Sequence, residues 1–71
     1  MEKKYMEKLV DKYCKIVTKE PGEDRATVVI GILEDVDYKD GFILVESEQG
    51  LGCLRIDTII AIKTKTKEKT I

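Results

Sequence analysis

Histidine, tryptophan and asparagine are absent from this chain of 71 residues, and proline and phenylalanine each occur once. Without histidine, a serine or cysteine nucleophile lacks its usual general base, so no catalytic triad is expected. Phosphate-binding glycine loops of the GxxxxGKS/T or GxGxxG type are missing too. A chain this short also has little room for a walled cleft. We therefore expect no enzyme, no catalytic residue and no cofactor.

Long apolar runs are also missing. No stretch approaches the ~18 residues of a membrane span, and the first residues lead into a charged segment rather than a signal peptide. We therefore expect no membrane association and a cytoplasmic location. Charged side chains are plentiful but nearly balanced, with 13 basic, 14 acidic and a net charge of −1. This balance argues against generic binding of polyanions, which favours a basic surface.

Cysteine is scarce, because only Cys14 and Cys53 are present, 39 residues apart. They lack the paired spacing of zinc ligands. Reduced thiols in a small core are the simplest interpretation, in keeping with a reducing compartment, and a disulfide between them is the alternative. The acidic stretch 35–40 lacks the glycine and the distal glutamate of a calcium loop. No metal site is therefore expected.

The length predicts one domain, residues 1–71. A domain of this size buries roughly 60% of the surface that its unfolded chain exposes, so it is marginally stable by itself. With 42% hydrophobic residues, the chain is expected to rely on a partner or on a second copy of itself.

Apolar side chains in the first segment, residues 2–13, recur with the spacing of one helical face. They are Tyr5, Leu9 and Tyr13, flanked by Met6 and Val10. Charged side chains occupy the other positions, so the pattern predicts an amphipathic helix. Because a helix this short is not stable alone, we expect it to dock through Tyr5, Leu9 and Tyr13.

From residue 14 onward the pattern is typical of β-strands. Short runs of alternating or β-branched residues are separated by turn signals, of which residues 21–24, with Pro21 and Gly22, are the strongest. The predicted strands are residues 14–20, 25–36, 42–45, 53–56 and 59–62. Gly31 lies inside the longest run, where a glycine is typical of a bulge or a sharp bend.

These elements predict a mainly β (α+β) fold. We expect an N-terminal helix, a strongly bent five-stranded antiparallel barrel over residues 14–63 and a Lys-rich tail over residues 64–71, with another SH3-like or OB-like barrel as the alternative. The strand 42–45 is apolar on both faces, so the helix is expected to cover part of the second face and a neighbouring subunit the rest. The expected core residues are Ile30, Ile32, Phe42, Leu44 and Ile60.

Charge is distributed unevenly along the chain. Residues 34–48 carry six acids and one lysine, a net charge of −5, whereas residues 63–71 carry four lysines and one acid, a net charge of +3. Three interpretations fit this pattern: a solvated tail beside an acidic loop, a nucleic-acid contact by the tail, and pairing of tail and loop between subunits.

Two segments of the chain resemble the signatures of the Sm and Sm-like (LSm) family. In residues 31–44, the positions that fall on the spacing of the first signature are Gly31, Leu33, Asp37 and Leu44. In residues 54–59, the positions that fit the second signature are Leu54, Arg55, Asp57 and Ile59, and Ile56 replaces the family's glycine. The separation of the two segments also suits the family, in which an N-terminal helix precedes the first strand. The resemblance covers about residues 2–63.

The resemblance implies a cyclic homo-oligomer, in which the fourth strand of one subunit pairs with the fifth strand of the next. Such a ring leaves no free sheet edge. The candidate interface residues are Cys53, Leu54, Ile59, Ile60 and Ile62.

The resemblance also implies a site for single-stranded RNA. In the family, an apolar stacking residue, an asparagine and an arginine hold a uridine-type base. Here Asp40 and Gly41 stand at the first two positions and Arg55 at the third, and the remaining candidate residues are Asp37, Ile56 and Asp57. An aspartate cannot stack on a base and repels phosphate, so RNA binding is expected to be weak and not uridine-specific.

Two alternatives remain open at this point. Arg55 fits an ion pair with Asp57 or Asp37 as well as a ligand contact. The whole chain also fits a protein-interaction or structural oligomerisation module that has the same small-barrel fold and does not bind RNA.

Overall fold

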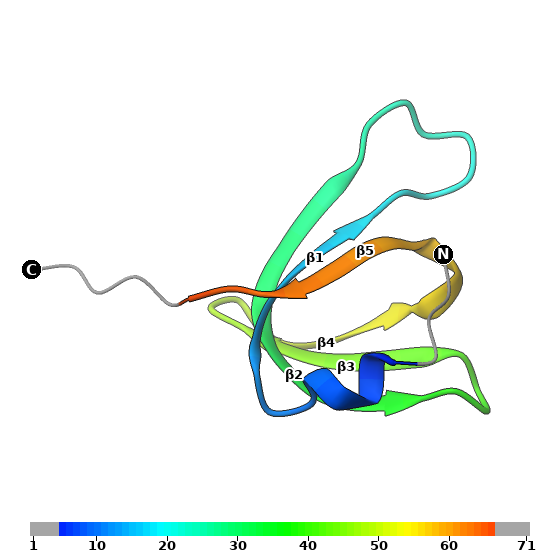
Figure 1. The fold of residues 1–71 in the computed structure, drawn as a ribbon. Helices are drawn as coiled ribbons and strands as arrows, with labels where there is room; N and C mark the ends of the chain where they lie inside the picture. Colours follow the sequence, from blue (N-terminus) through cyan, green and yellow to red (C-terminus); the bar gives the residue numbers. More distant parts are fainter. Residues whose placement is uncertain (1–4, 67–71) are drawn as a thin grey trace, which may run out of the picture.

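The computed structural model describes residues 5–66, which form one five-stranded antiparallel sheet and two short 3-10 turns (Figure 1). The elements in chain order are η1 (Met6–Leu9), β1 (Tyr13–Thr18), β2 (Thr27–Asp37), β3 (Phe42–Ser47), β4 (Gly50–Arg55), η2 (Ile56–Thr58) and β5 (Ile59–Thr64). The prediction of a mainly β fold with five antiparallel strands is therefore confirmed.

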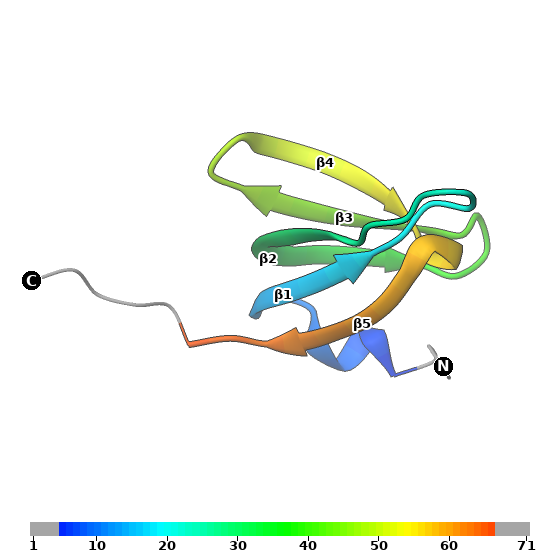
Figure 2. The same ribbon diagram turned by 90° about the horizontal axis from the view of Figure 1, so that it is seen from above.

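The predicted barrel is not closed. The strand order is β4-β3-β2-β1-β5, so β4 and β5 are the two edges, each with one neighbouring strand among the described residues. Figure 2 shows the sheet curving from β4 at the top of the view to β5 at the bottom. Closure would require β4 and β5 to pair with each other, and within one subunit they do not.

Gly31 lies where strands β2 and β3 approach each other closely. Strand β2 pairs with β1 along its first part and with β3 along its second, and Gly31 is buried where the two partners overlap. A Cβ atom at Gly31 would collide with the main-chain carbonyl of Glu46 in β3. The glycine that the sequence marked as a bend is therefore the residue that lets the paired strand β3 approach β2 this closely.

The core consists of the side chains on the opposite face from the one expected. The buried hydrophobic residues are Met6, Cys14, Ile16, Leu33, Ile43, Val45 and Ile59. Of the residues expected there, Ile30, Phe42 and Ile60 are exposed, and Ile32 and Leu44 are half-buried. The predicted core was wrong by one residue along the strands, and such a shift moves every side chain to the other face.

The predicted helix over residues 2–13 is wrong for the residues that the structure describes. Only the four-residue 3-10 turn η1 forms, and Tyr13 already belongs to β1. The main chain of Asp11 turns away with a φ of 72°, and its N–H donates to the Leu33 carbonyl at 2.7 Å. Pairing with β2 therefore ends the turn before a helix can develop. Residues 2–4 lie outside the described part.

The docking residue of this turn also differs from the prediction. The Met6 side chain is buried and only 2% exposed, whereas Tyr5 is 57% exposed and Leu9 is half-buried. Residues 67–71 of the predicted tail lie outside the described residues, and Thr64 belongs to β5. No helix within residues 5–66 has the length and the apolar character needed to cross a membrane.

Candidate functional site

The two signature segments meet at one end of the sheet. Phe42, at the start of β3, lies opposite Arg55, at the end of β4. The N–H of Ile56 then donates to the carbonyl of Gly41 at 2.8 Å. The turn between β2 and β3 and the turn η2 are therefore adjacent, although they are far apart in sequence.

Asp37 shapes the first of these turns. Its main-chain carbonyl accepts a hydrogen bond from the Gly41 N–H at 2.8 Å, and its carboxylate accepts one from the Asp40 N–H at 3.0 Å. Gly41 has a φ of 82°, in the left-handed region that suits glycine. Asp37 is therefore a residue that positions the turn.

A hollow of about 420 Å³ opens between the two turns. Its lining residues are Tyr38, Asp40, Gly41, Phe42, Arg55, Ile56 and Asp57. Five of the six candidate RNA-site residues thus line one hollow, and Asp37 supports it from the turn. Among residues 5–66, no group of three or more side chains is arranged to hold a metal ion.

Sequence reasoning missed two aromatic residues in this hollow, Tyr38 and Phe42. Both are 42% exposed, so part of each ring is open to solvent. The signature positions directed attention to Asp40 and Gly41, and the aromatic residues on either side of that pair were the signal that could have revealed them. They provide the apolar ring surface that Asp40 lacks.

Arg55 is held by two carboxylates at the rim of the hollow. Its Nη2 lies 3.1 Å from Oε2 of Glu20, and its Nε lies 3.3 Å from Oδ1 of Asp57. The expected pair with Asp57 forms, whereas the pair with Glu20 was not foreseen. The three side chains are between 50% and 78% exposed, and exposed pairs contribute only about 0–1 kcal/mol. A phosphate can therefore compete for Arg55.

The position of Glu20 follows from a contact between two loops. The Lys19 N–H donates to the Thr58 carbonyl at 2.8 Å, which holds the loop after β1 against η2. The Thr58 hydroxyl in turn donates to the Arg55 carbonyl at 2.8 Å. These bonds bring a carboxylate from a loop distant in sequence to the guanidinium.

Ile56 fits its turn without the conformation that the family's glycine allows. Among the described residues other than glycine, only Asp11 has a positive φ. Ile56 begins the 3-10 turn η2, and its half-buried side chain packs against the core. This departure from the signature therefore leaves the turn intact.

The candidate interface residues lie on the two sheet edges, with different exposure. On β4, Cys53 is exposed and Leu54 is half-buried. On β5, Ile59 is buried, Ile62 is half-buried and Ile60 is 47% exposed. Both cysteines are free. Cys14 is buried in the core, whereas Cys53 is exposed, so the expected placement of the thiols in the core holds for Cys14 alone.

Comparisons of the chain with models of protein families, with curated proteins and with solved structures find no match.

Proposed function

We propose that this chain is an Sm-like subunit that assembles with copies of itself into a closed ring, with β4 of each subunit paired with β5 of the next. The observation that supports this proposal is the pair of free sheet edges. Strands β4 and β5 have six residues each and no second neighbour among residues 5–66. Unprotected edges of this kind pair readily with another strand.

The side chains at the edges favour the same conclusion. Leu51 on β4 is 62% exposed and Ile60 on β5 is 47% exposed. Beside β4, a hollow of about 220 Å³ is bordered by Val29, Val45 and Leu54, and a Cβ at Gly52 would meet nothing within 4 Å. A neighbouring strand would cover this apolar surface. Pairing of β4 with β5 joins two different edges, so it is head to tail, and such contacts form a ring when the rotation between subunits closes.

A proline on the free edge of β4 tests this assembly. The Ile56 N–H points toward β3, where it meets the Gly41 carbonyl. Successive N–H groups of an antiparallel strand point in opposite directions, so the Cys53 N–H points to the free edge. Cys53→Pro removes this donor without breaking a bond to β3. We expect Cys53→Pro to give folded monomers by native mass spectrometry and circular dichroism.

Cys53→Ala is the matched control, because it removes the thiol and keeps the N–H. It should assemble like the wild-type protein. If Cys53→Pro stays fully assembled, the subunits do not pair through this edge. If Cys53→Ala also dissociates, the side chain rather than backbone pairing holds the contact, and this proposal is wrong.

As a second candidate function, the hollow at the Arg55 end supports weak binding of single-stranded RNA with little base preference. The rings of Tyr38 and Phe42 beside Arg55 favour it, since base stacking on aromatic rings contributes about 1–3 kcal/mol per base. Two of the lining side chains, Asp40 and Asp57, are carboxylates, and Glu20 occupies the guanidinium. This negative charge opposes phosphate.

Titrations of oligo-U and oligo-A at low and moderate salt test the RNA function. We expect weak binding that falls steeply with salt and is reduced by Phe42→Ala. Submicromolar affinity with about a tenfold preference for oligo-U, equivalent to about 1.4 kcal/mol, would contradict it. No binding at low salt would instead favour a module that serves assembly alone.

A double substitution tests whether the hollow has the geometry of the family's base site. Asp40→Met with Gly41→Asn restores the stacking residue and the amide. Asparagine is among the residues that best tolerate the left-handed conformation found at Gly41. We expect this variant to gain preference for oligo-U over the wild-type protein, and no gain would argue against a family-like base site.

A further inference from the structure

We propose that the lysines at the end of β5 bind the acidic β3–β4 hairpin of the next copy, so that charge selects which sheet edges meet and in which direction. This inference rests on the proposed self-assembly. It names the side chains that make one edge recognise the other.

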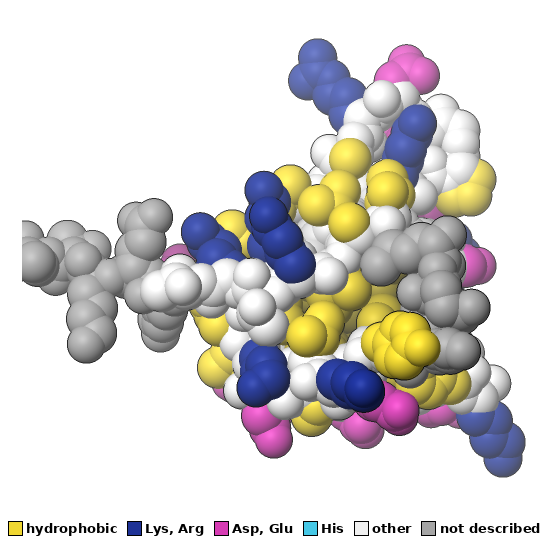
Figure 3. Space-filling view, viewed as in Figure 1, with side chains coloured by type: hydrophobic (Ala, Val, Ile, Leu, Met, Phe, Trp, Pro, Cys, Tyr) yellow, Lys and Arg dark blue, Asp and Glu magenta, His cyan; other side chains and the backbone are white. Residues whose placement is uncertain are grey.

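The basic side of the contact is a group of lysines that form no ion pair with any other residue in the described part of the chain. Lys15 in β1 lies directly opposite Lys63 in β5. Lys65 lies two residues further along, and its N–H donates to the Tyr13 carbonyl at 2.8 Å. Like charges opposite each other in a sheet are destabilising. The ion pairs within residues 5–66 are the two made by Arg55, so these ammonium groups have no carboxylate partner there. In Figure 3, dark-blue side chains stand over the region of β1 and β5 among hydrophobic ones.

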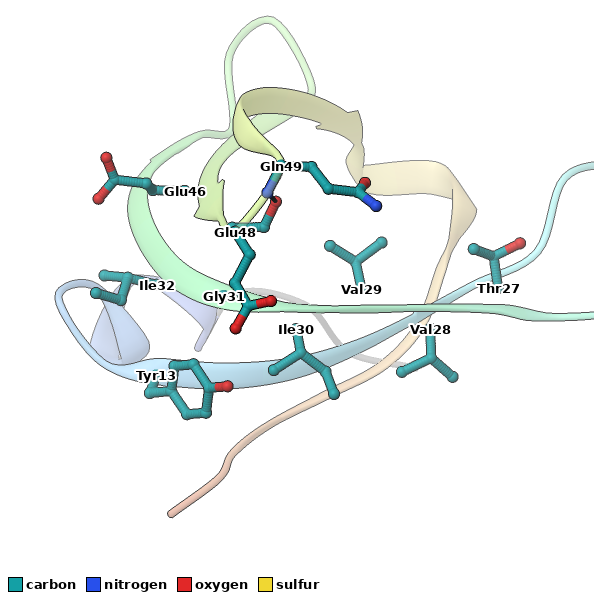
Figure 4. A pocket seen from close by; sticks show the side chains of 11 residues that line it. Tyr13, Thr27, Val28, Val29, Ile30, Gly31, Ile32, Glu46, Glu48 and Gln49 are labelled. Carbon is teal, nitrogen blue, oxygen red and sulfur yellow. Dashed lines mark hydrogen bonds between the residues drawn. The ribbon is translucent and has the colours of Figure 1, made fainter. Parts of the chain in front are cut away.

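The acidic side of the contact is the hairpin that joins β3 to β4. Glu46 lies near the end of β3, opposite Ile32 of β2, Glu48 lies in the turn that follows, and both glutamates are exposed. Neither forms an ion pair among the described residues. Both border a hollow of about 650 Å³, and Figure 4 shows Glu46 near Ile32 and Glu48 near Gly31. Two carboxylates are therefore available at the start of β4.

The places of these charges along the strands favour one direction of pairing. The lysines lie at the end of β5, and the glutamates lie just before β4 begins. Antiparallel pairing brings the end of one strand beside the start of the other, so Lys63 and Lys65 approach the hairpin of the next copy. Parallel pairing would bring them beside Arg55, a like charge. Pairing of two β5 edges would supply no carboxylate to the lysines. Complementary charge of this kind selects partners and orientation.

Exchange of the charges tests the inference. One variant carries Lys63→Glu with Lys65→Glu, and the other carries Glu46→Lys with Glu48→Lys. Each variant alone places like charges at the contact, so we expect its apparent dissociation constant for assembly to rise by about tenfold or more. In an equimolar mixture, every contact between two unlike variants again has opposite charges. We therefore expect native mass spectrometry of the mixture to show oligomers that contain both variants.

Matched controls separate local from net charge. Arg25→Glu with Lys39→Glu changes the net charge as the first variant does, and Glu23→Lys with Asp24→Lys changes it as the second does, at exposed positions in the loops that follow β1 and β2. These controls should assemble like the wild-type protein. Circular dichroism of each variant verifies that it is folded.

The outcomes distinguish this inference from the proposed function. If Cys53→Pro dissociates the assembly but both charge variants assemble normally, the ring stands and the charge contact is wrong. If folded charge variants dissociate and their mixture does not reassemble, charge complementarity is also wrong. If the lysine variant assembles normally but loses RNA binding, the lysines serve nucleic acid instead. A wild-type monomer would overturn the proposed function itself.

Discussion

At the scale of single residues, the fold depends on the absence of a Cβ atom at Gly31. Gly31 faces the Glu46 carbonyl, and a Cβ there would overlap with the main chain of β3. Main-chain atoms paired in a sheet cannot move aside cheaply. The close approach of the paired strands β2 and β3 at Gly31 therefore admits glycine alone.

Gly31→Ala should destabilise the protein by about 1–3 kcal/mol or more, as overpacking does in cores. Gly52→Ala is the matched control, because within one subunit a Cβ at Gly52 meets nothing within 4 Å and its φ is not positive. Gly52 lies on the β4 edge, so native mass spectrometry verifies that both variants assemble like the wild-type protein. We expect the control to stay within about 0.5 kcal/mol of the wild-type protein. Denaturant midpoints at equal protein concentration measure the stability of both variants. Equal midpoints for the two would show that β3 does not approach Gly31 closely.

The two cysteines should differ sharply in reactivity. Burial, the largest influence, raises the pKa of the Cys14 thiol and outweighs the opposing effects of a Leu33 main-chain hydrogen bond and the Lys12 charge. The Cys14 Sγ also donates to the Lys12 carbonyl at 3.3 Å, which favours the protonated thiol. Cys53 is exposed. Brief alkylation near neutral pH should add one label, at Cys53, and a second only after unfolding.

The raised pKa also has a consequence for stability. The native state holds the Cys14 proton more tightly than the unfolded chain does. The protonated Cys14 thiol therefore contributes stability that is fully present below the thiol pKa of the unfolded chain. This stability is lost as the pH rises through the raised pKa of the native state. Rapid double labelling of the native protein would contradict the buried position of Cys14.

At the scale of elements, the N-terminal turn η1 is anchored by Met6. Met6 is 2% exposed and belongs to the core, whereas Leu9 is only half-buried. The turn contacts β2 and β5, so it covers the core between them. Its stabilising effect comes from this packing, because four residues cannot form a stable helix alone.

Met6→Ala should lower the free energy of unfolding by about 2–5 kcal/mol, the range for truncation of large buried side chains. Leu9→Ala should have a smaller effect, since part of that side chain already contacts solvent. Chemical denaturation of the two variants measures the difference. An effect of Leu9→Ala larger than that of Met6→Ala would favour the helix that the sequence pattern suggests.

The strands could be predicted from the sequence, but the face that they bury could not. Turn residues such as Gly22 and Gly41 separate the strands, and both have positive φ values. The strand predicted over residues 53–56 begins earlier, at Gly50. The run around Ile43 is apolar on both faces, so alternation did not identify the inner one. The inner face is set by the contact of Gly31 with β3, a tertiary contact that no local pattern records.

The candidate site shows the same division between local and distant information. Asp40, Gly41 and Arg55, which the signature spacing assigns to one site, line the same hollow. The pairing of Arg55 with Glu20 could not be predicted, because it depends on a loop contact between residues far apart in sequence. The position of Phe42 in the hollow was missed because the sequence pattern assigned Phe42 to the core.

At the scale of the whole molecule, the subunit is an open curved sheet with two different edges. The proposed head-to-tail pairing would account for the apolar edge residues, the uncovered surface beside β4, and the opposite charges at the start of β4 and the end of β5. A chain of this size gains stability when a partner covers such surface. Self-assembly is therefore the central claim about this protein.

Native mass spectrometry of the wild-type protein over a dilution series that includes micromolar concentrations tests this claim most directly. Closed head-to-tail pairing predicts one dominant oligomer of fixed subunit number, because every edge is satisfied only when the ring is complete. Open pairing would give a ladder of sizes that grows with concentration. A monomer at micromolar concentration would contradict the account.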